Sequence, residues 1–224
     1  MTERRLPWLE AARGPAAFPD PRTAFDEPNG LLAAGGALTP EWLLGAYRRG
    51  IFPWFSDGQP ILWWSPDPRA VVDPAAFRPA RSLAQSMRNR GYETRLDTEF
   101  AAVVAACAAP RGDGAGTWIT PAMRAAYEAL HRLGHAHSVE TWADGQLVGG
   151  LYGVRIGALF CGESMFSRAR DASKVAFARL VAVALETGLG LIDCQLPTPH
   201  LASLGAVTID RASFLERIAL LVDR

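Results

Sequence analysis

The stretch from residue 137 to residue 196 constrains the fold most, because its apolar residues change from a strand period to a helix period and back. Three segments alternate apolar and polar residues as half-buried strands do: residues 137–142, 146–154 and 158–166. Asp144-Gly145 is a typical hairpin turn between the first two. Residues 174–186 are apolar nearly all round and are followed by Gly188, which predicts a buried helix, and residues 191–196 predict a returning strand. Antiparallel strands, a buried helix and a returning strand favour an α+β fold.

The remaining segments predict helices separated by irregular connections. Helices are expected over residues 40–49, 81–90, 121–133 and 213–222. Residues 1 to about 30 are rich in proline and are expected to form extended chain with turns, and residues 51–64 are expected to form an aromatic surface loop. We therefore expect a small N-terminal domain, residues 1–70, followed by a larger domain, residues 71–224.

The composition is that of an ordinary globular protein, with 49% hydrophobic and 21% charged residues. No apolar run reaches the roughly 18 to 20 residues that cross a bilayer, and the first ten residues contain no apolar signal segment. Three cysteines without a C-x-x-C spacing indicate a reducing compartment, so a cytoplasmic protein without membrane contact is expected. Because the net charge is zero, any nucleic-acid partner has to bind a local basic patch.

The histidines and cysteines do not have the spacing of a metal site. The four histidines, His131, His135, His137 and His200, lack the paired arrangement of structural zinc sites. They are expected to lie at the surface or in hydrogen bonds, and Cys161 and Cys194 are expected to be inert apolar side chains. No Ser-His-Asp or Cys-His triad is visible, and no metal or other cofactor is expected.

A series of short motifs in one fixed order resembles a known family. The motifs lie at residues 27–32, 47–55, 63–69, 116–120, 133–138, 160–168 (Phe-Cys-Gly-Glu-Ser-Met-Phe-Ser-Arg) and 191–195 (Leu-Ile-Asp-Cys-Gln). Together they resemble the leucyl/phenylalanyl-tRNA–protein transferases over about residues 25–216. The resemblance implies a monomer whose partners are aminoacyl-tRNA and acceptor proteins. It implies transfer of Leu or Phe, and less well of Met, to the N-terminal α-amino group of proteins that begin with Arg or Lys, which marks them for N-end-rule degradation.

The resemblance also assigns substrate-binding residues. Trp54 and Phe160 occupy positions of the pocket for the donor side chain, Leu180 stands where relatives can carry an aromatic residue, and Ser164 lies in the same motif region. Trp118 is a candidate stacking face for the terminal adenine of tRNA. Two simpler explanations stay open: the aromatic residues of segment 51–64 could pack two domains together, and Trp118 could anchor its glycine-rich loop.

A polar pair on the last predicted strand is the candidate for chemistry. Asp193 and Gln195 are two residues apart, so a regular strand turns both side chains to one face. A structural hydrogen-bonded pair is one explanation. The resemblance implies instead that Gln195 contacts the reacting groups, that Asp193 orients or polarises it, and that Glu163 lies near the acceptor's amine or basic side chain. Because the donor is an activated ester, positioning can supply much of the catalysis without a strongly perturbed base.

An arginine-rich segment is the candidate for tRNA binding. Residues 77–95 contain five arginines and only one acidic residue. Arg81, Arg88 and Arg90 are the expected phosphate contacts. The simpler explanation is a solvated helix face.

Two other functions remain as alternatives. The C-terminal half also looks like the acetyltransferase superfamily, with a mixed sheet and packed helices, which allows a coenzyme A-dependent N-acetyltransferase. Coenzyme A needs a glycine-rich turn at a helix start, and residues 167–173 contain no glycine. The second alternative, a non-catalytic RNA- or peptide-binding module, leaves Asp193 and Gln195 without a role.

Overall fold

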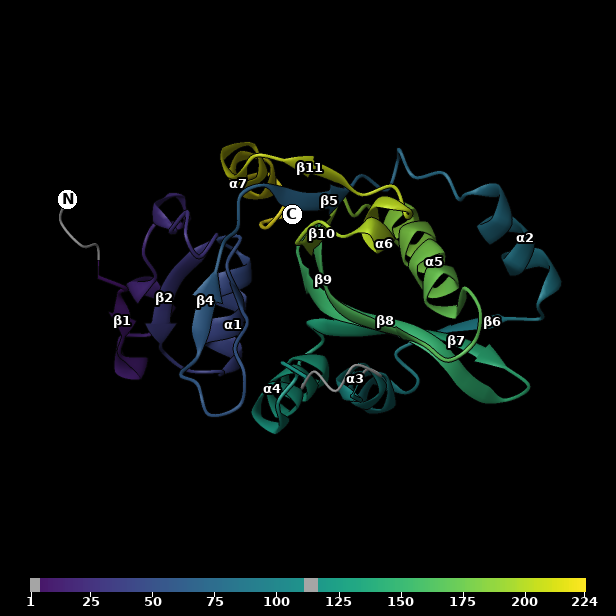
Figure 1. Cartoon of the computed structure of the whole chain (residues 1–224), viewed down its shortest axis with the longest axis horizontal. Helices are drawn as coiled ribbons and strands as arrows, with labels where there is room; N and C mark the ends of the chain where they lie inside the picture. Colours follow the sequence, from purple (N-terminus) through teal and green to yellow (C-terminus); the bar gives the residue numbers. More distant parts are fainter. Residues whose placement is uncertain (1–4, 111–116) are drawn as a thin grey trace.

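The computed structural model describes residues 5–110 and 117–224, and the glycine-rich stretch 112–116 lies outside these ranges. Within the described residues the strands form two sheets, which Figure 1 shows side by side. The smaller sheet has four strands in the order β1-β2-β4-β3, and the larger has seven in the order β11-β5-β10-β9-β8-β7-β6.

The smaller sheet is formed by the N-terminal segment. Its strands are β1 (Trp8–Leu9), β2 (Leu31–Gly35), β3 (Phe52–Pro53) and β4 (Leu62–Trp64), with helix α1 (Pro40–Tyr47) packed beside β3. Three short 3₁₀ helices connect β1 to β2: η1 (Ala11–Arg13), η2 (Pro15–Ala17) and η3 (Pro21–Thr23). The prediction of an irregular loop over residues 51–64 is wrong, because β3 and β4 pair antiparallel as a hairpin within it. The two prolines and one glycine of this segment concealed two short strands.

The larger sheet contains the segment that the alternating pattern identified. Its strands are β5 (Arg69–Val72), β6 (Glu93–Leu96), β7 (Ala136–Ala143), β8 (Gln146–Ile156), β9 (Leu159–Ser167), β10 (Leu191–Gln195) and β11 (Val207–Ile209). Neighbouring strands are antiparallel except β9 and β10, which are parallel because α5 (Ala172–Thr187) crosses over between them.

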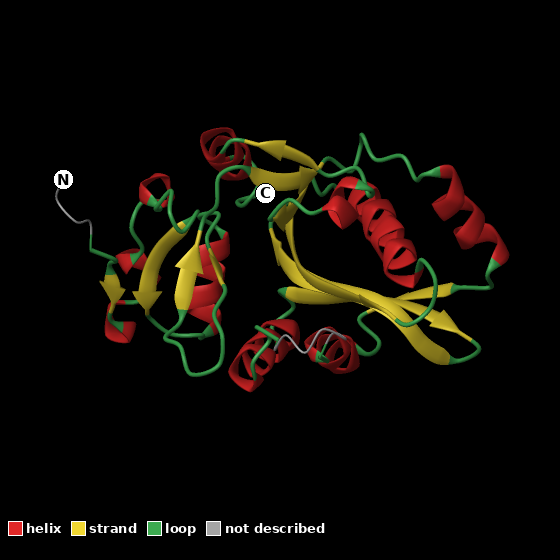
Figure 2. Cartoon of the chain, in the orientation of Figure 1, coloured by secondary structure: helices red, strands yellow, loops and turns green. Residues whose placement is uncertain are grey.

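Helices cover both faces of the larger sheet (Figures 1 and 2). The others are α2 (Arg81–Asn89), α3 (Phe100–Ala108), α4 (Pro121–Arg132), α6 (Pro199–Ala202) and α7 (Arg211–Ala219). Helix α5 packs on one face with α2 outside it, and α3 and α4 pack on the opposite face. This arrangement confirms the predicted α+β fold with a mixed sheet and packed helices.

The predicted helices and strands agree with the structure to within about two residues at most ends. The sequence did not reveal α3, the four-residue α6 or the strands outside residues 136–195. Residues 100–108 are apolar or alanine throughout, so they show neither a helical period nor a polar face. Helix α1 is followed by Gly50, as the sequence predicted, at φ +71°. A Cβ atom there would lie 2.8 Å from the Phe214 ring, so only glycine fits this turn against α7.

One hydrophobic core joins the two sheets. Trp63 is fully buried between Phe18 and Trp42, with ring centroids 4.8 and 6.1 Å away. The same cluster of buried residues continues to Tyr127 and Tyr152 on the larger sheet and its helices. The division into domains at residue 70 stays a prediction. In the part of the chain that the structure describes, no helix has both the length and the apolar character of a membrane span.

Candidate active site

A cavity of about 660 Å³ lies where β9 and β10 diverge. The two strands pair only as far as Asp193 and Cys161, and β9 then continues to Ser167 while β10 ends at Gln195. The wall is mostly apolar and comes from α5, β8, β9 and β10, and the β3–β4 hairpin contributes aromatic residues. Its volume is in the range of roughly 300–1,000 Å³ that is typical of small-molecule sites.

Most of the predicted site residues line this cavity. These are Trp54, Trp118, Glu163, Ser164, Leu180 and Gln195. They come from five separate segments of the chain, and only the folded structure brings them together. Phe160 and Asp193 are not among the lining residues.

Phe160 is buried rather than open to the cavity. Only 2% of it is exposed, and it belongs to the same hydrophobic cluster as the lining residues Phe177 and Leu180. Direct contact of Phe160 with a substrate side chain stays a prediction.

The aromatic residues of segment 51–64 contribute both to the core and to the cavity wall. Phe52 and Trp63 are buried in the core, and Phe52 also lines the cavity. Trp54 is 41% exposed and lines the cavity, and its backbone oxygen accepts a hydrogen bond of 2.7 Å from Trp64 Nε1. Core packing and cavity lining therefore both apply to this segment, and Phe52 takes part in both.

Glu163 provides the carboxyl group of the cavity. Gln195 Nε2 donates a hydrogen bond of 3.2 Å to its Oε1, and the Tyr127 hydroxyl donates one of 2.5 Å to its Oε2. Burial raises the pKa of the Glu163 carboxyl to about 7, although the hydrogen bonding of Tyr127 and Tyr47 acts to lower it. A carboxyl group with this pKa exists in both protonation states near neutral pH, which is a property of many acid–base residues.

Asp193 is held in a buried ion pair. Arg69 Nε and Nη2 donate to its two carboxylate oxygens at 2.8 and 2.7 Å, and both side chains are only 1% exposed. Arg69 Nη1 also donates to Gly50 O, and the guanidinium lies over the rings of Phe52 and Phe214. This one arginine therefore links the small sheet, α7 and the catalytic candidate strand β10.

The predicted geometry of Asp193 and Gln195 needs correction. Gln195 has φ +57°, and the pairing of β10 with β5 shifts register between the two residues. A left-handed residue breaks the alternation of a strand, so the two-residue spacing does not fix a common face. Asp193 Oδ1 accepts a hydrogen bond of 2.9 Å from the Gln195 backbone N–H, so Asp193 contacts the main chain of Gln195 rather than its amide side chain.

Arg69, Tyr47 and Tyr127 are candidates that sequence reasoning missed. Arg69 and Tyr47 lie at ends of motifs that carry the family resemblance, but nothing local distinguished them from other motif residues. Tyr127 shares the buried side of α4 with Met123 and Leu130, where a tyrosine is typical of core packing. Their partners are 124, 80 and 36 residues away along the chain.

The two cysteines near the site are buried. Burial raises the pKa of the Cys161 thiol, and it raises that of Cys194, which lines the cavity. Both remain protonated thiols at neutral pH, so neither has the thiolate character of a nucleophile.

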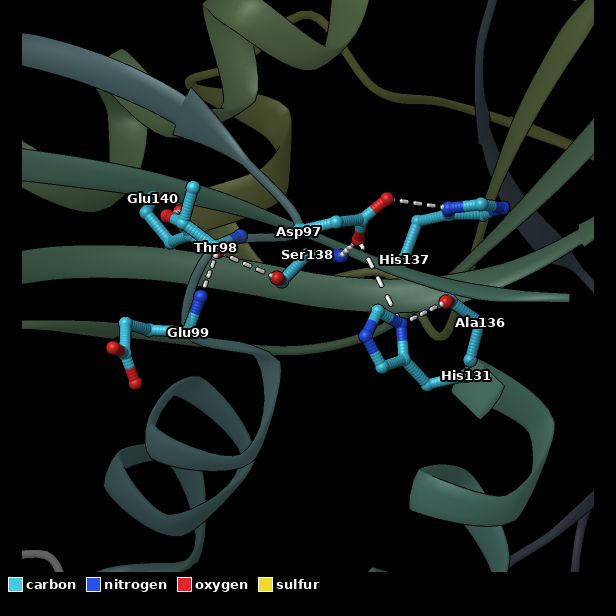
Figure 3. A network of polar contacts seen from close by, with 8 residues as sticks. All are labelled: Asp97, Thr98, Glu99, His131, Ala136, His137, Ser138 and Glu140. Carbon is cyan, nitrogen blue, oxygen red and sulfur yellow. Dashed lines mark hydrogen bonds and ion pairs between the residues drawn. The ribbon is translucent and has the colours of Figure 1, made fainter. Parts of the chain in front are cut away.

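The histidines on the opposite face take part in a structural network (Figure 3). The Asp97 carboxylate contacts His137 Nδ1 at 2.8 Å, and His131 Nδ1 donates to Ala136 O at 2.8 Å. The adjacent Glu140 is fully buried and accepts hydrogen bonds from Ser138 Oγ, Thr98 Oγ1 and the backbone N–H groups that precede α3. This network attaches α3 to β7. Within residues 5–110 and 117–224 no three His, Cys, Asp or Glu side chains form a group that could hold a metal ion.

The three predicted tRNA-binding arginines lie on or just after α2. Arg81, Arg88 and Arg90 are exposed. Among the described residues, none of the three guanidinium groups forms an ion pair, unlike Arg95 with Glu93. Ser86 Oγ of α2 donates to Asp171 Oδ2 at 2.7 Å, which attaches α2 to the start of α5 beside the cavity-lining Ser173.

The chain is similar to known proteins over nearly its whole length. Residues 71–219 match the family described as leucyl/phenylalanyl-tRNA protein transferase, and residues 36–67 match the N-terminal domain of that family. A leucyl/phenylalanyl-tRNA–protein transferase of Azoarcus sp. (strain BH72) is 61% identical over 209 residues, which cover 93% of this chain and 88% of that protein. One from Aromatoleum aromaticum is 57% identical over 214 residues, which cover 96% and 89%. Among solved structures, a GCN5-related N-acetyltransferase from Kribbella flavida is 12% identical, with a TM-score of 0.43. The matched region covers 76% of this chain and 61% of the acetyltransferase chain.

These matches define the protein as an aminoacyltransferase. The chain belongs to the leucyl/phenylalanyl-tRNA–protein transferase family, which confirms the resemblance carried by its motifs.

Proposed function

We propose that the protein transfers Leu or Phe, and less well Met, from aminoacyl-tRNA to the α-amino group of proteins that begin with Arg or Lys. Such transfer marks the acceptor for N-end-rule degradation. The observation that carries the proposal is a single cavity in which an apolar wall meets one carboxyl group and one amide. A cytoplasmic monomer is proposed with it.

The apolar wall suits the side chain of the donor amino acid. Phe177, Leu180 and Ile192 line it, and Trp54 lies at the hairpin side. Trp118 also lines the cavity and is partly exposed, which supports its assignment as a stacking face for the terminal adenine.

Glu163 and Gln195 suit the acceptor amine. In the proposed reaction the amine nitrogen attacks the ester carbonyl carbon, the new C–N bond forms, and the bond from that carbon to the tRNA 3′ oxygen breaks. The nucleophile loses one proton and the leaving 3′ oxygen gains one. An α-amino group has a pKa of about 7.7–8.0, so a carboxylate of pKa about 7 can take its proton at neutral pH. The Gln195 amide is the group available to orient the amine or the developing oxyanion.

The coenzyme A alternative is disfavoured by the start of α5. The Ser173 N–H donates to Ser167 Oγ at 3.2 Å, and the Ala172 N–H donates to Ala169 O at 3.1 Å. These N–H groups have partners within the chain, whereas a pyrophosphate site leaves such donors free.

Transfer of labelled amino acids from charged tRNA tests the proposal. Leu, Phe and Met should all be transferred to peptides that begin with Arg or Lys, because one methylene in an apolar pocket discriminates by only about 1–3 kcal/mol. Ile and Val, which are branched at Cβ, should be transferred at least several-fold more slowly. The measurement is incorporation of label into peptides that differ only at residue one.

RNase treatment of the donor is the control for this experiment and should abolish transfer. Equal transfer of Leu and Val would contradict the assignment of the apolar wall. RNase-resistant transfer that depends on acetyl coenzyme A would restore the acetyltransferase alternative.

Charge reversal on α2 tests the tRNA surface. The Arg81→Glu/Arg88→Glu variant should bind tRNA more weakly, and the slope of log K against log salt should become less negative by about 1 to 2. A complex with fewer phosphate contacts releases fewer counterions when it forms. The salt slope therefore reports the number of phosphate contacts rather than the fraction of folded protein. Filter binding of tRNA at several salt concentrations measures both quantities.

The matched control is Arg13→Glu/Arg22→Glu, which makes the same change in net charge on the exposed 3₁₀ helices η1 and η3. This control should keep the parental slope. An unchanged slope in the α2 variant would show that its arginines are a solvated helix face only.

A further inference from the structure

Two buried tyrosines form a hydrogen-bonded chain that ends at Glu163. The Tyr47 hydroxyl on α1 lies 2.8 Å from the Tyr127 hydroxyl on α4, and the Tyr127 hydroxyl lies 2.5 Å from Glu163 Oε2 on β9. Tyr127 is fully buried and Tyr47 is 1% exposed. This series of hydrogen bonds therefore connects α1, beside the small sheet, to the cavity through the shared core.

The direction of these hydrogen bonds follows from counting protons. Burial raises the pKa of both tyrosines well above the usual value, so both hydroxyls carry a proton at neutral pH. Tyr127 has one proton and donates it to Glu163 when that residue is a carboxylate. Tyr47 must then be the donor to Tyr127.

We propose that Tyr47 and Tyr127 are positioning residues that hold the Glu163 carboxyl toward the cavity and set its affinity for a proton. The inference rests on the function proposed above, in which Glu163 takes a proton from the acceptor amine. Gln195 holds the other carboxylate oxygen, so the pair of tyrosines and the amide fix both ends of the group.

The chain can follow a change of protonation without movement of its heavy atoms. When Glu163 Oε2 gains a proton, that oxygen becomes a donor to Tyr127, whose own hydroxyl can rotate to donate to Tyr47. Each oxygen keeps a partner in both states, which matters because an unpaired buried polar group is costly. A phenylalanine at either position ends the chain at that point.

The other groups that shift the pKa of Glu163 are unchanged in the two tyrosine variants of this chain, Tyr127→Phe and Tyr47→Phe. Burial acts most strongly to raise its pKa, and the Asp193 carboxylate acts in the same direction, while the Arg69 guanidinium lowers it. The remaining titratable neighbours that its charge affects are Tyr47, Tyr127, Tyr152 and Cys161. Loss of a tyrosine hydroxyl therefore removes a contribution that opposes burial.

The test is a pH titration of Glu163 in Tyr127→Phe and Tyr47→Phe. Loss of a hydrogen bond to a charged group of about 1.5–3 kcal/mol, at 1.36 kcal/mol per unit, should raise the midpoint in Tyr127→Phe by about one to two pH units. Tyr47→Phe should raise it by less, because the hydrogen bonding of Tyr47 lowers the Glu163 pKa less than that of Tyr127 does. The carboxyl band in infrared difference spectra against Glu163→Gln reports the midpoint without any substrate, and the pH dependence of kcat/KM should move in the same direction.

Tyr152→Phe is the matched control. Its ring packs edge-on against Tyr127 with centroids 5.2 Å apart, and among the described residues its buried hydroxyl has no hydrogen-bond partner. The Glu163 midpoint should be unchanged in this variant. Midpoints in Tyr127→Phe and Tyr47→Phe that equal the parental value, in proteins with parental thermal melts, would overturn the proposal. If Tyr127→Phe does not fold, Tyr47→Phe decides the question, because the hydrogen bonding of Tyr47 also lowers the Glu163 pKa.

The infrared titration separates this proposal from the proposed function. If the parental protein transfers no amino acid from charged tRNA, the proposed function fails while the titration still tests the tyrosine chain. If transfer is normal and the midpoints do not move, only the role of the tyrosines is wrong.

Discussion

Gln195→Met should slow aminoacyl transfer by about 10²–10³-fold, which is the loss typical when one polar group that stabilises a developing charge is removed. Methionine has nearly the length of glutamine but no amide, so the cavity keeps its shape and loses the hydrogen bond to Glu163. The rate should fall in kcat as well as in kcat/KM, since the proposed contact is strongest in the transition state. Single-turnover transfer of Leu to a peptide that begins with Arg measures the chemical step.

Gln146→Met makes the same chemical change at the exposed start of β8, outside the cavity, and should keep the parental rate. Thermal melts of both variants are needed, because Gln195 is buried and lies in a backbone conformation with φ +57°. Parental transfer by a normally folded Gln195→Met would show that the amide is structural.

The same variant tests how Asp193 acts. Asp193 accepts the backbone N–H of Gln195 at 2.9 Å, so its proposed role is to hold Gln195 in its unusual conformation. If Asp193 acts only through Gln195, Asp193→Asn/Gln195→Met should lose little more rate than the more damaging single change. Additive losses would instead indicate two independent roles.

Arg69→Met should lower the free energy of unfolding by about 3–5 kcal/mol, the cost typical of leaving one member of a buried ion pair without its partner. The Asp193 carboxylate would lose two hydrogen bonds in a site that is 1% exposed. The change also removes the cation between the rings of Phe52 and Phe214, which joins the small sheet to α7. Urea denaturation followed by tryptophan fluorescence measures the effect.

The matched control is Arg179→Met, which breaks an exposed ion pair with Glu186 at 3.0 Å. Pairs of this kind contribute about 0–1 kcal/mol. Arg69→Met/Asp193→Leu should recover part of the lost stability, because no buried charge is left without a partner. A loss in Arg69→Met no greater than that in Arg179→Met would show that the pair is not important for folding.

Local sequence patterns determined most of the longer helices, the central strands of the larger sheet and the family. The alternation over residues 137–166 and the apolar run over 174–186 predicted β7, β8, β9 and α5, because burial of one or both faces imposes a period on the side chains. The motifs around Trp54, Glu163 and Gln195 identified the family, and these residues all line one cavity. Local patterns gave no correct prediction where the signal was absent, as in α3, or ambiguous, as in the β3–β4 hairpin.

Only the tertiary structure decided what holds the candidate site together. Asp193 binds Arg69 from 124 residues away, and Tyr47 and Tyr127, 80 residues apart, meet before they reach Glu163. Such partners follow from how the sheets and helices pack around one core, and no spacing along the chain records that packing. The Gln195 backbone, where the regular strand ends, likewise donates to the Asp193 carboxylate that Arg69 binds. The sequence therefore determined which groups this protein carries, and long-range packing decided which of them touch.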